Sequence, residues 1–321
     1  MAIQYTTGEQ VRQAVEEICG KLEAKGGLQN VFCVACGGSL SNLYPLYYLL
    51  RSESKKLWAQ EINANEFVHA APAGADERAL VVCMSMTGTT PETVAAAKKA
   101  KELGATVITI AGTEDSPMSA YGDYRWIFSN ETAGTQVDYA ACNMALALRL
   151  GFELLRVYEG YAHYDKAMAG FSVLDRSVHH ARAMVQKRAV RFGEEHKDDP
   201  VIYTVGSGPS YNTAYAFSIC ILLEMEWINS SCIHAGEMFH GPFEIADFNT
   251  PFVIFMSEGK NRYLDERALR FLQRYAGRVS IIDAKELGVS IIAPEVEEYF
   301  SAIYNWVVAY EYAKELAIAK R

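Results

Sequence analysis

The chain has 321 residues, 50% of them hydrophobic, which suits two globular domains rather than a disordered chain. Its net charge of −9 argues against a nucleic-acid or anionic-membrane partner, and no apolar run approaches the ~20 residues of a membrane span. Seven cysteines spread through apolar segments, and a start of the chain that lacks a signal sequence, indicate reduced thiols in a cytoplasmic protein.

The first half of the chain alternates apolar strands with amphipathic helices, a pattern typical of α/β folds with parallel sheets. After an N-terminal helix, the pattern predicts strands at 31–36, 80–84 and 107–111, and helices at 37–50, 91–103 and 143–158. The polar segment 161–199 follows. It is predicted to form one bridging helix, at 172–195, that ends before the turn at Asp198-Asp199-Pro200.

The second half repeats this order, with predicted strands at 201–205, 252–256 and 279–282 and helices at 214–225 and 300–319. Residues of the same type recur at a separation of 171 or 172 residues: Gly37 and Gly208, His69 and His240, Ser85 and Ser257, Val107 and Val279. Four matches at nearly one separation indicate an internal duplication. We therefore predict two tandem doubly wound parallel sheets in a three-layer αβα fold, with domains at 1–160 and 200–321.

A loop rich in hydroxyl groups follows the second predicted strand and carries Ser85, Thr87, Thr89 and Thr90. Ligands of open α/β sheets bind at the carboxyl ends of strands, where a helix N-terminus offers free N–H groups and the positive end of its dipole. One hydroxyl is enough to cap a helix, so four of them favour a site for a phosphate monoester. A neighbouring strand end, with Ser39, offers one more hydroxyl. No Walker A lysine follows the loop.

A second cluster, at 233–244, combines His234, Glu237, His240 and Glu244, and it lies just downstream of Glu224 in an apolar helix. Burying charge without a partner is costly, so such groups rarely fill a core. Proton-transfer chemistry requires an acid and a base held close together, and this region can supply both. The alternative is a surface loop whose histidines cap helices.

These motifs resemble the sugar isomerase (SIS) domain family. Its signature S-x-[ST]-G-x-T-x-[DE] is matched by Ser85, Thr87, Gly88, Thr90 and Glu92. The tandem arrangement is similar to the isomerase half of glucosamine-6-phosphate synthase, but the chain lacks the glutamine-hydrolysing domain and the lysine-bearing tail of that enzyme. The strings 34–39, 224–228, 234–244 and 265–269 resemble the fructosamine 6-phosphate deglycases more closely. That family carries a further tail, so the chain is expected to be truncated at its C-terminus.

The resemblance implies a role for each residue of the two clusters. It implies that the phosphosugar is held by Gly38, Ser39, Ser85, Met86, Thr87 and Thr90, with Met86 standing where the synthase has Gln. Glu224 would move protons on the sugar carbons, and His240, donated by a neighbouring subunit, would assist. Glu237 and Glu244 would support them. Neither a metal nor a cofactor is implied.

The activity implied by the resemblance is a deglycase that splits a fructosamine 6-phosphate into glucose 6-phosphate and an amino acid through an enaminol. The alternatives are a phosphosugar aldose–ketose isomerase or aminase, and a non-catalytic phosphosugar sensor. We also expect a homodimer, partly because an apolar helix such as 300–319 could be buried between subunits.

Overall fold

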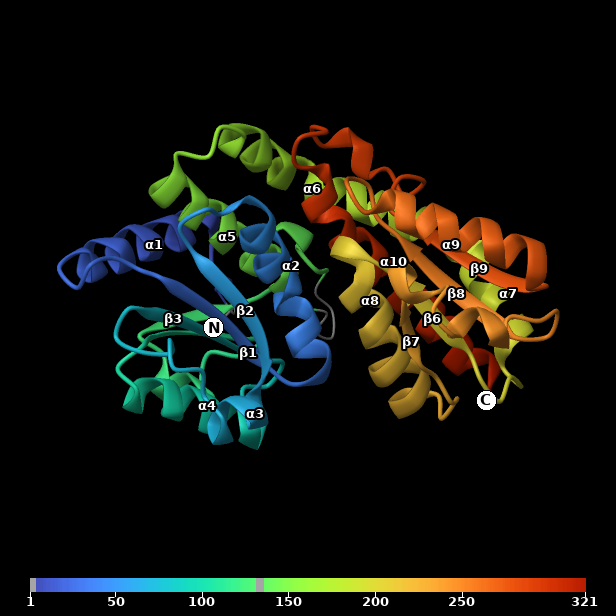
Figure 1. Cartoon of the computed structure of the whole chain (residues 1–321), viewed down its shortest axis with the longest axis horizontal. Coiled ribbons are helices and arrows are strands. Elements are labelled where there is room, and N and C mark those ends of the chain that lie inside the picture. Colours follow the sequence, from blue (N-terminus) through green and yellow to red (C-terminus); the bar gives the residue numbers. More distant parts are fainter. Residues whose placement is uncertain (1–3, 131–135) are drawn as a thin grey trace. The chain divides into compact units, whose positions relative to one another are not determined.

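The computed structural model describes residues 4–130 and 136–321 of the chain. By its internal contacts the chain divides into two compact units, Met1–Asp165 and Lys166–Arg321. Each unit is a parallel sheet with helices on both faces (Figure 1). Among the described helices, none is long and apolar enough to cross a membrane.

The first unit has a five-stranded sheet in the order β2-β1-β3-β4-β5. Its strands are β1 (Asn30–Ala35), β2 (Trp58–Asn63), β3 (Ala79–Ser85), β4 (Thr106–Ala111) and β5 (Tyr124–Ile127). Its helices are α1 (Gly8–Glu23), α2 (Gly37–Glu53), α3 (Ala64–His69), α4 (Pro91–Glu102), η1 (Ser119–Tyr121), η2 (Tyr139–Ala141) and α5 (Asn143–Glu159). β3 is buried along its whole length, as expected of a strand covered on both faces.

The helices of the first unit form two layers around its sheet. On one face, Phe67 of α3 and the alanines of α4 pack against Val34, Val81 and Val107. On the other face, α5 packs on α1 and α2 (Figure 1). The small side chains of α4 let this helix lie close to the strands, so the ends of β1 and β3 are held in fixed positions.

The second unit has a four-stranded sheet in the order β7-β6-β8-β9. Its strands are β6 (Tyr203–Gly206), β7 (Cys232–His234), β8 (Pro251–Met256) and β9 (Arg278–Asp283). Its longer helices are α6 (Tyr164–Met184), α7 (Gln186–His196), α8 (Tyr211–Ala216), η4 (Phe217–Met225), α9 (Arg262–Tyr275) and α10 (Glu297–Ala319). Single helical turns lie at η3 (Gly208–Ser210), η5 (Ala235–Glu237), η6 (Pro242–Ile245) and η7 (Val289–Ile291).

The two sheets have the same order of corresponding strands, since β6, β7, β8 and β9 repeat β1, β2, β3 and β4. The paired glycines Gly37 and Gly208 even share a left-handed backbone, with φ of 53° and 52°. This conformation favours glycine, because it has no Cβ to clash. The prediction of two tandem doubly wound parallel sheets is confirmed.

Alternating side chains of β8 show which elements cover each face of the second sheet. Ile254 and Met256 share a core cluster with Met238 and with α9. Phe255 points to the other face, where its ring lies 5.6 Å from that of Phe217 in η4. The segment after β7 and α9 therefore cover one face, and η4 covers the other.

One expectation about helices is wrong. The helix predicted at 172–195 is two helices, α6 and α7, separated at Val185. The apolar helix predicted at 300–319 is α10, and most of it is buried in its own unit, where Phe192 of α7 stacks on Tyr312. Tyr310 and Ile318 of this helix are exposed, and the homodimer stays a prediction.

The helix that carries Glu224 is wider than an α-helix. Its last part, η4, is a π-helix, and the amide of Glu226 donates to the carbonyl of Ile221, five residues back. Stretches of π-helix are rare and frequently lie at functional sites. The chain leaves η4 through Trp227, whose φ of 55° is the one positive value of a non-glycine residue among those described.

We expect Trp227→Gly to leave the free energy of unfolding unchanged or to raise it by about 1 kcal/mol, because a left-handed backbone costs a non-glycine residue about that much. The side chain of Trp227 is 89% exposed, so little burial is lost. Urea unfolding followed by far-UV circular dichroism measures the change. The control is Trp58→Gly, which removes a similarly exposed indole from a strand and should cost about 0.5–1 kcal/mol. Equal losses in the two variants would contradict strain at Trp227.

Candidate active site

The first candidate site lies where the strand order of the first sheet reverses. α2 leads from β1 to β2 and α4 leads from β3 to β4, so the connections diverge between the adjacent strands β1 and β3. Open α/β sheets bind ligands in the crevice at the carboxyl ends of such strands. The structure brings the predicted binding residues to these two strand ends: Gly38 and Ser39 in the first turn of α2, and Ser85, Met86, Thr87 and Thr90 between β3 and α4.

The hydroxyl groups after β3 form two pairs. Ser85 Oγ lies 2.9 Å from Thr90 Oγ1, and Thr87 Oγ1 lies 2.6 Å from Thr89 Oγ1. Ser85 is buried and also accepts the amide of Gly88 at 3.2 Å, whereas Thr87 and Thr89 are exposed. Among the described residues, the amides of Thr87 and Thr89 donate no backbone hydrogen bond. The loop therefore offers rotatable hydroxyls and free N–H groups to an anion. We call it, with the first turn of α2, the cradle.

Backbone contacts hold the cradle loop in place. The carbonyl of Met86 accepts the amide of Gly112 at 2.9 Å, and that of Gly88 accepts the amide of Met118 at 3.0 Å. Gly88 has a φ of 66°, and a Cβ on it would lie 2.1 Å from Ser116 Oγ. No side chain fits there, so glycine is required. The side chain of Met86 is 52% exposed beside the loop.

The chemistry of the cradle suits a phosphate monoester. Its groups are neutral hydroxyl and amide donors at the N-termini of α2 and α4, where the helix dipoles add positive potential. The segment 85–90 contains no Lys or Arg. An anion would therefore be held by hydrogen bonds with fixed geometry, and these select for the shape of the ligand as well as for its charge.

Glu224 lies near the end of η4, at the amino edge of the second sheet, where the amide of Ile202 donates to the carbonyl of Asn229. Its carboxylate is exposed and has no hydrogen bond or ion pair with any described residue. The nearby Glu226 is different. It is 4% exposed, its Oε1 has no partner among the described residues, and burial raises the pKa of its carboxyl. Glu224 is thus the carboxylate of this helix that is free to meet a substrate.

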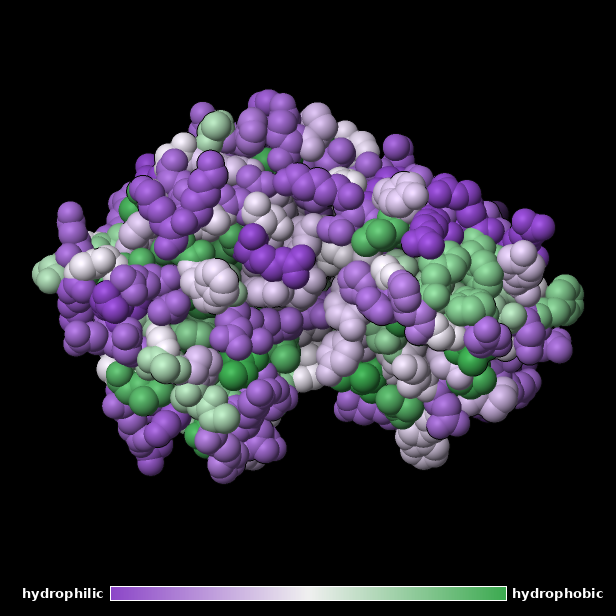
Figure 2. Space-filling model, viewed as in Figure 1, coloured by the Kyte–Doolittle hydropathy of each residue, from purple (hydrophilic) through white to green (hydrophobic). Residues whose placement is uncertain are grey.

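His240 lies in an exposed turn between η5 and η6, and its amide donates to the carbonyl of Glu237 at 2.9 Å. Glu237 and Glu244 are also exposed. The aromatic residues on either side of His240 anchor this turn on α9. Phe239 packs against Phe271 with ring centroids 5.4 Å apart, and the Arg267 guanidinium lies 4.0 Å from the Phe239 ring centroid. An apolar area of the surface lies beside α9 in this unit (Figure 2).

The sheet of the second unit separates Glu224 from His240. Phe217 of the Glu224 helix packs on one face, and Met238, two residues before His240, packs on the other. The elements that carry the two residues therefore lie on opposite faces of this sheet, although the residues are close along the chain.

The second unit has its own strand reversal, between β6 and β8, and sequence reasoning missed what lies there. Asp265 of α9 is fully buried and accepts hydrogen bonds from Ser207 Oγ at 2.5 Å and from the amide of Ser257 at 3.3 Å. Burial raises the pKa of Asp265 to about 7, with these hydrogen bonds and Arg262 acting in the opposite direction. Arg262 in turn makes a two-pronged ion pair with Asp283 at 2.8 and 2.9 Å.

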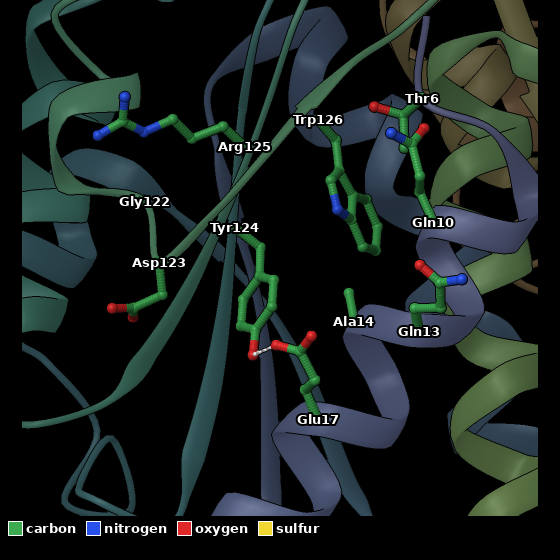
Figure 3. Close-up of a pocket in the computed structure, with 10 residues that line it drawn as sticks. All are labelled: Thr6, Gln10, Gln13, Ala14, Glu17, Gly122, Asp123, Tyr124, Arg125 and Trp126. Atoms are coloured by element: carbon green, nitrogen blue, oxygen red, sulfur yellow. Dashed lines mark hydrogen bonds between the residues drawn. The ribbon is translucent and has the colours of Figure 1, made fainter.

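A further groove of about 530 Å³ lies between α1 and the edge strand β5 (Figure 3). The Tyr124 hydroxyl donates to Glu17 at 3.1 Å and accepts from Lys21 at 2.9 Å, so contacts between α1 and β5 already engage this part of the groove. The groove lies along the sheet edge rather than at the carboxyl ends of the strands. We assign it to the packing of α1 on β5.

Comparison with known proteins identifies the same family that the sequence motifs resemble. Residues 50–147 match the SIS domain. The chain is 35% identical to fructosamine deglycase FrlB of Bacillus subtilis over 96% of its length and 92% of that protein. It is 26% identical to the fructoselysine 6-phosphate deglycase of Escherichia coli (strain K12), over 86% of this chain and 78% of that one. Its fold matches a candidate phosphosugar isomerase of Salmonella typhimurium LT2 with a TM-score of 0.93 at 42% identity, covering 98% and 94% of the two chains.

The tandem parallel sheets and the cradle, together with this match, define a SIS-domain protein. Within that class the chain belongs to the family of the fructosamine deglycases, which are enzymes. In residues 4–130 and 136–321, no group of three or more His, Cys, Asp or Glu is placed to hold a metal ion.

The buried carboxyl of Asp265 predicts a pH dependence of stability. Its pKa of about 7 in the folded chain exceeds the value of about 4 expected for an unfolded one. The folded state therefore holds an extra proton, and the stability that this proton contributes is present below pH ~4 and is lost as the pH rises through ~7. Asp265→Asn cannot ionise, so its stability relative to wild type should rise between about pH 4 and pH 7 and then level off.

Urea midpoints of both proteins across this pH range measure the effect. Asp247→Asn is the matched control. This exposed carboxylate has a lowered pKa because the amides of Thr250 and Asn249 donate to it. Its contribution is lost only as the pH falls below ~4. Parallel profiles for wild type and Asp265→Asn would show that Asp265 is ionised throughout.

Proposed function

We propose that the chain is a fructosamine 6-phosphate deglycase. It would split the 6-phosphate of an Amadori compound of an amino acid into glucose 6-phosphate and the free amino acid. The observation that carries the proposal is a hydroxyl-and-amide cradle at the β1/β3 strand ends of a chain that is 35% identical to a fructosamine deglycase along nearly its whole length.

In the proposed reaction the cradle holds the phosphate and so fixes the sugar by its far end. A base removes a proton from C1 of the ketosamine, which gives an enaminol. Protonation at C2 then gives the Schiff base of an aldose, and the nitrogen carries the positive charge. Water adds at C1 of this Schiff base, the C–N bond breaks, and the amine leaves as the free amino acid.

Glu224 is our candidate for the base that moves the proton between C1 and C2. A carboxylate can serve both carbons if it lies over them, because it can accept the proton and return it. Its exposed position and its lack of a partner among the described residues support this role. The π-helix that carries it supports the role as well.

His240 is our candidate for the group that exchanges a proton with the sugar oxygen, and we place it in the site of a second copy of the chain. Two observations support this placement. The second sheet separates His240 from Glu224 within one unit. Two apolar side chains a few residues further on are exposed, Ile245 at 38% and Phe248 at 77%, as expected of a surface that meets another protein. Glu237 and Glu244 would support the turn that carries His240.

The proposal is tested by the products. The purified chain is incubated with the 6-phosphates of fructosyl-lysine, fructosyl-aspartate and fructosyl-glycine, and glucose 6-phosphate is measured with a coupled dehydrogenase. We expect release of glucose 6-phosphate and amino acid from at least one of them. The alternative is a phosphosugar isomerase, which the similarity to the Salmonella protein favours. Conversion of fructose 6-phosphate, with none of the three cleaved, would replace the deglycase by this alternative.

The roles of Glu224 and His240 are tested by mixing variants. Glu224→Gln and His240→Ala should each lower kcat at least about 100-fold, since general acid–base groups contribute at least that much. If His240 acts in the site of a second copy, refolding the two variants together should restore part of the activity, because a mixed dimer contains one site with both residues.

Glu237→Gln mixed with Glu224→Gln is the control, because Glu237 lies in the same turn as His240 but is given no proton-transfer role. In this control mixture the activity should be proportional to the amount of the Glu237→Gln chain, because only this chain supplies Glu224. Failure of the Glu224→Gln and His240→Ala mixture to exceed its two components would place both residues in one chain's site. Near-normal activity of Glu224→Gln would rule out this residue as the base.

A further inference from the structure

The loop between β8 and α9 is the counterpart of the cradle loop between β3 and α4. Both loops follow a buried strand at a strand reversal, and both begin with a buried serine, Ser85 or Ser257. Both contain a glycine of positive φ, Gly88 at 66° and Gly259 at 96°. The second unit thus keeps the backbone plan of an anion site.

The side chains of the second loop differ from those of the first. Where the first loop has Thr87, Thr89 and Thr90, segment 258–261 reads Glu-Gly-Lys-Asn and has no hydroxyl. Its anion-binding groups are instead taken by carboxylates from helices. Glu298, in the first turn of α10, is 6% exposed and accepts the amide of Lys260 at 3.4 Å. Its carboxylate fills the space against the loop, since a Cβ on Gly259 would lie 2.4 Å from Glu298 Oε2.

Asp265 accepts hydrogen bonds from the donor groups at the two strand ends. It accepts the hydroxyl of Ser207, after β6, and the amide of Ser257, after β8. These are the two strand ends that correspond to those of β1 and β3 in the first unit. The raised pKa of Asp265 fits a carboxyl enclosed without a full complement of donors.

One donor of this second cradle is left over. Ser257 is fully buried, and its Oγ has no hydrogen-bond partner among the described residues. A buried hydroxyl without a partner is costly, so such a group needs an explanation. Its counterpart Ser85 pairs with Thr90 in the first unit. An anion with more oxygen atoms than a carboxylate would satisfy Ser257.

We propose that the second unit contains a latent oxyanion site that is closed by the built-in carboxyl groups of Glu298 and Asp265, and that this site would take phosphate when opened. The chain therefore has two cradles of common plan, of which one is open to a ligand and the other is occupied by its own side chains. The comparison with the first cradle rests on the proposed function. The test is independent of that function, because it measures phosphate binding after the second cradle itself has been opened.

The experiment opens the second cradle with Asp265→Asn/Glu298→Ala and measures binding of inorganic phosphate and of glucose 6-phosphate by calorimetry. Asp265→Asn keeps the size of the side chain and one of its two acceptor oxygens but cannot ionise, and Glu298→Ala empties the space. The matched control is Asp265→Asn/Glu298→Gln, which removes the same two ionisable groups but keeps the space filled. We expect the open variant to bind one more equivalent of phosphate than wild type, and the control to bind the same number as wild type.

An open variant that folds but gains no phosphate overturns the inference, as does a control that gains as much as the open variant. Where the alanine variant fails to unfold cooperatively, Asp265→Asn/Glu298→Ser takes its place, because serine is as small but polar. Ser85→Ala/Thr87→Ala separates the two proposals. Loss of wild-type glucose 6-phosphate binding in this variant supports the proposed function. If wild type binds two equivalents of phosphate and Ser85→Ala/Thr87→Ala binds one, the second cradle is already open in wild type. That result would overturn the latent site and leave the proposed function intact.

Discussion

The reversal of strand order in a parallel sheet is the constraint on which the rest of this structure depends. At β1 and β3 the chain leaves neighbouring strands in opposite directions, so two helix N-termini begin side by side. The first amides of a helix have no partner inside it, and those of Thr87 and Thr89 donate no backbone hydrogen bond to any described residue. Everything assigned to ligand binding follows from the need to satisfy these groups. In the first unit they are left to hydroxyls and to solvent, and in the second unit they are taken up by carboxylates of the chain.

The duplicated halves show how one backbone plan acquires two roles. The left-handed glycines, the strand order and the leading serines are common to both halves, and they define where an anion could lie. What differs is the side chains that reach this place. Threonine hydroxyls leave the first cradle open, whereas the carboxyl groups of Asp265 and Glu298 fill the second.

The sequence was sufficient to predict most of the fold, because long apolar strands and amphipathic helices leave a clear periodic pattern. It failed for β2, β5 and β7, which are short or carry polar residues at sheet edges, as in Trp58–Asn63. The cradle could be predicted because most of its hydroxyls come from one continuous segment, residues 85–90. The Asp265 network could not, because it joins Ser207, Ser257 and Asp265 from three separate segments. The spacing of Glu224 and His240 was misleading because residues that are close along the chain belong to elements on opposite faces of the second sheet.

The wide helix η4 has a consequence for how Glu224 is aimed. A helix with i→i+5 bonds advances through a smaller rotation per residue than an α-helix, so the direction of a side chain near its end depends on how many residues lie in the wide part. Deleting one residue from the apolar stretch before Glu224 would let the segment tighten to ordinary α periodicity. The carboxylate would then swing to another side of the helix although every residue type around it stayed the same. The role proposed for Glu224 therefore depends on the number of residues in this helix as well as on the acid at its end.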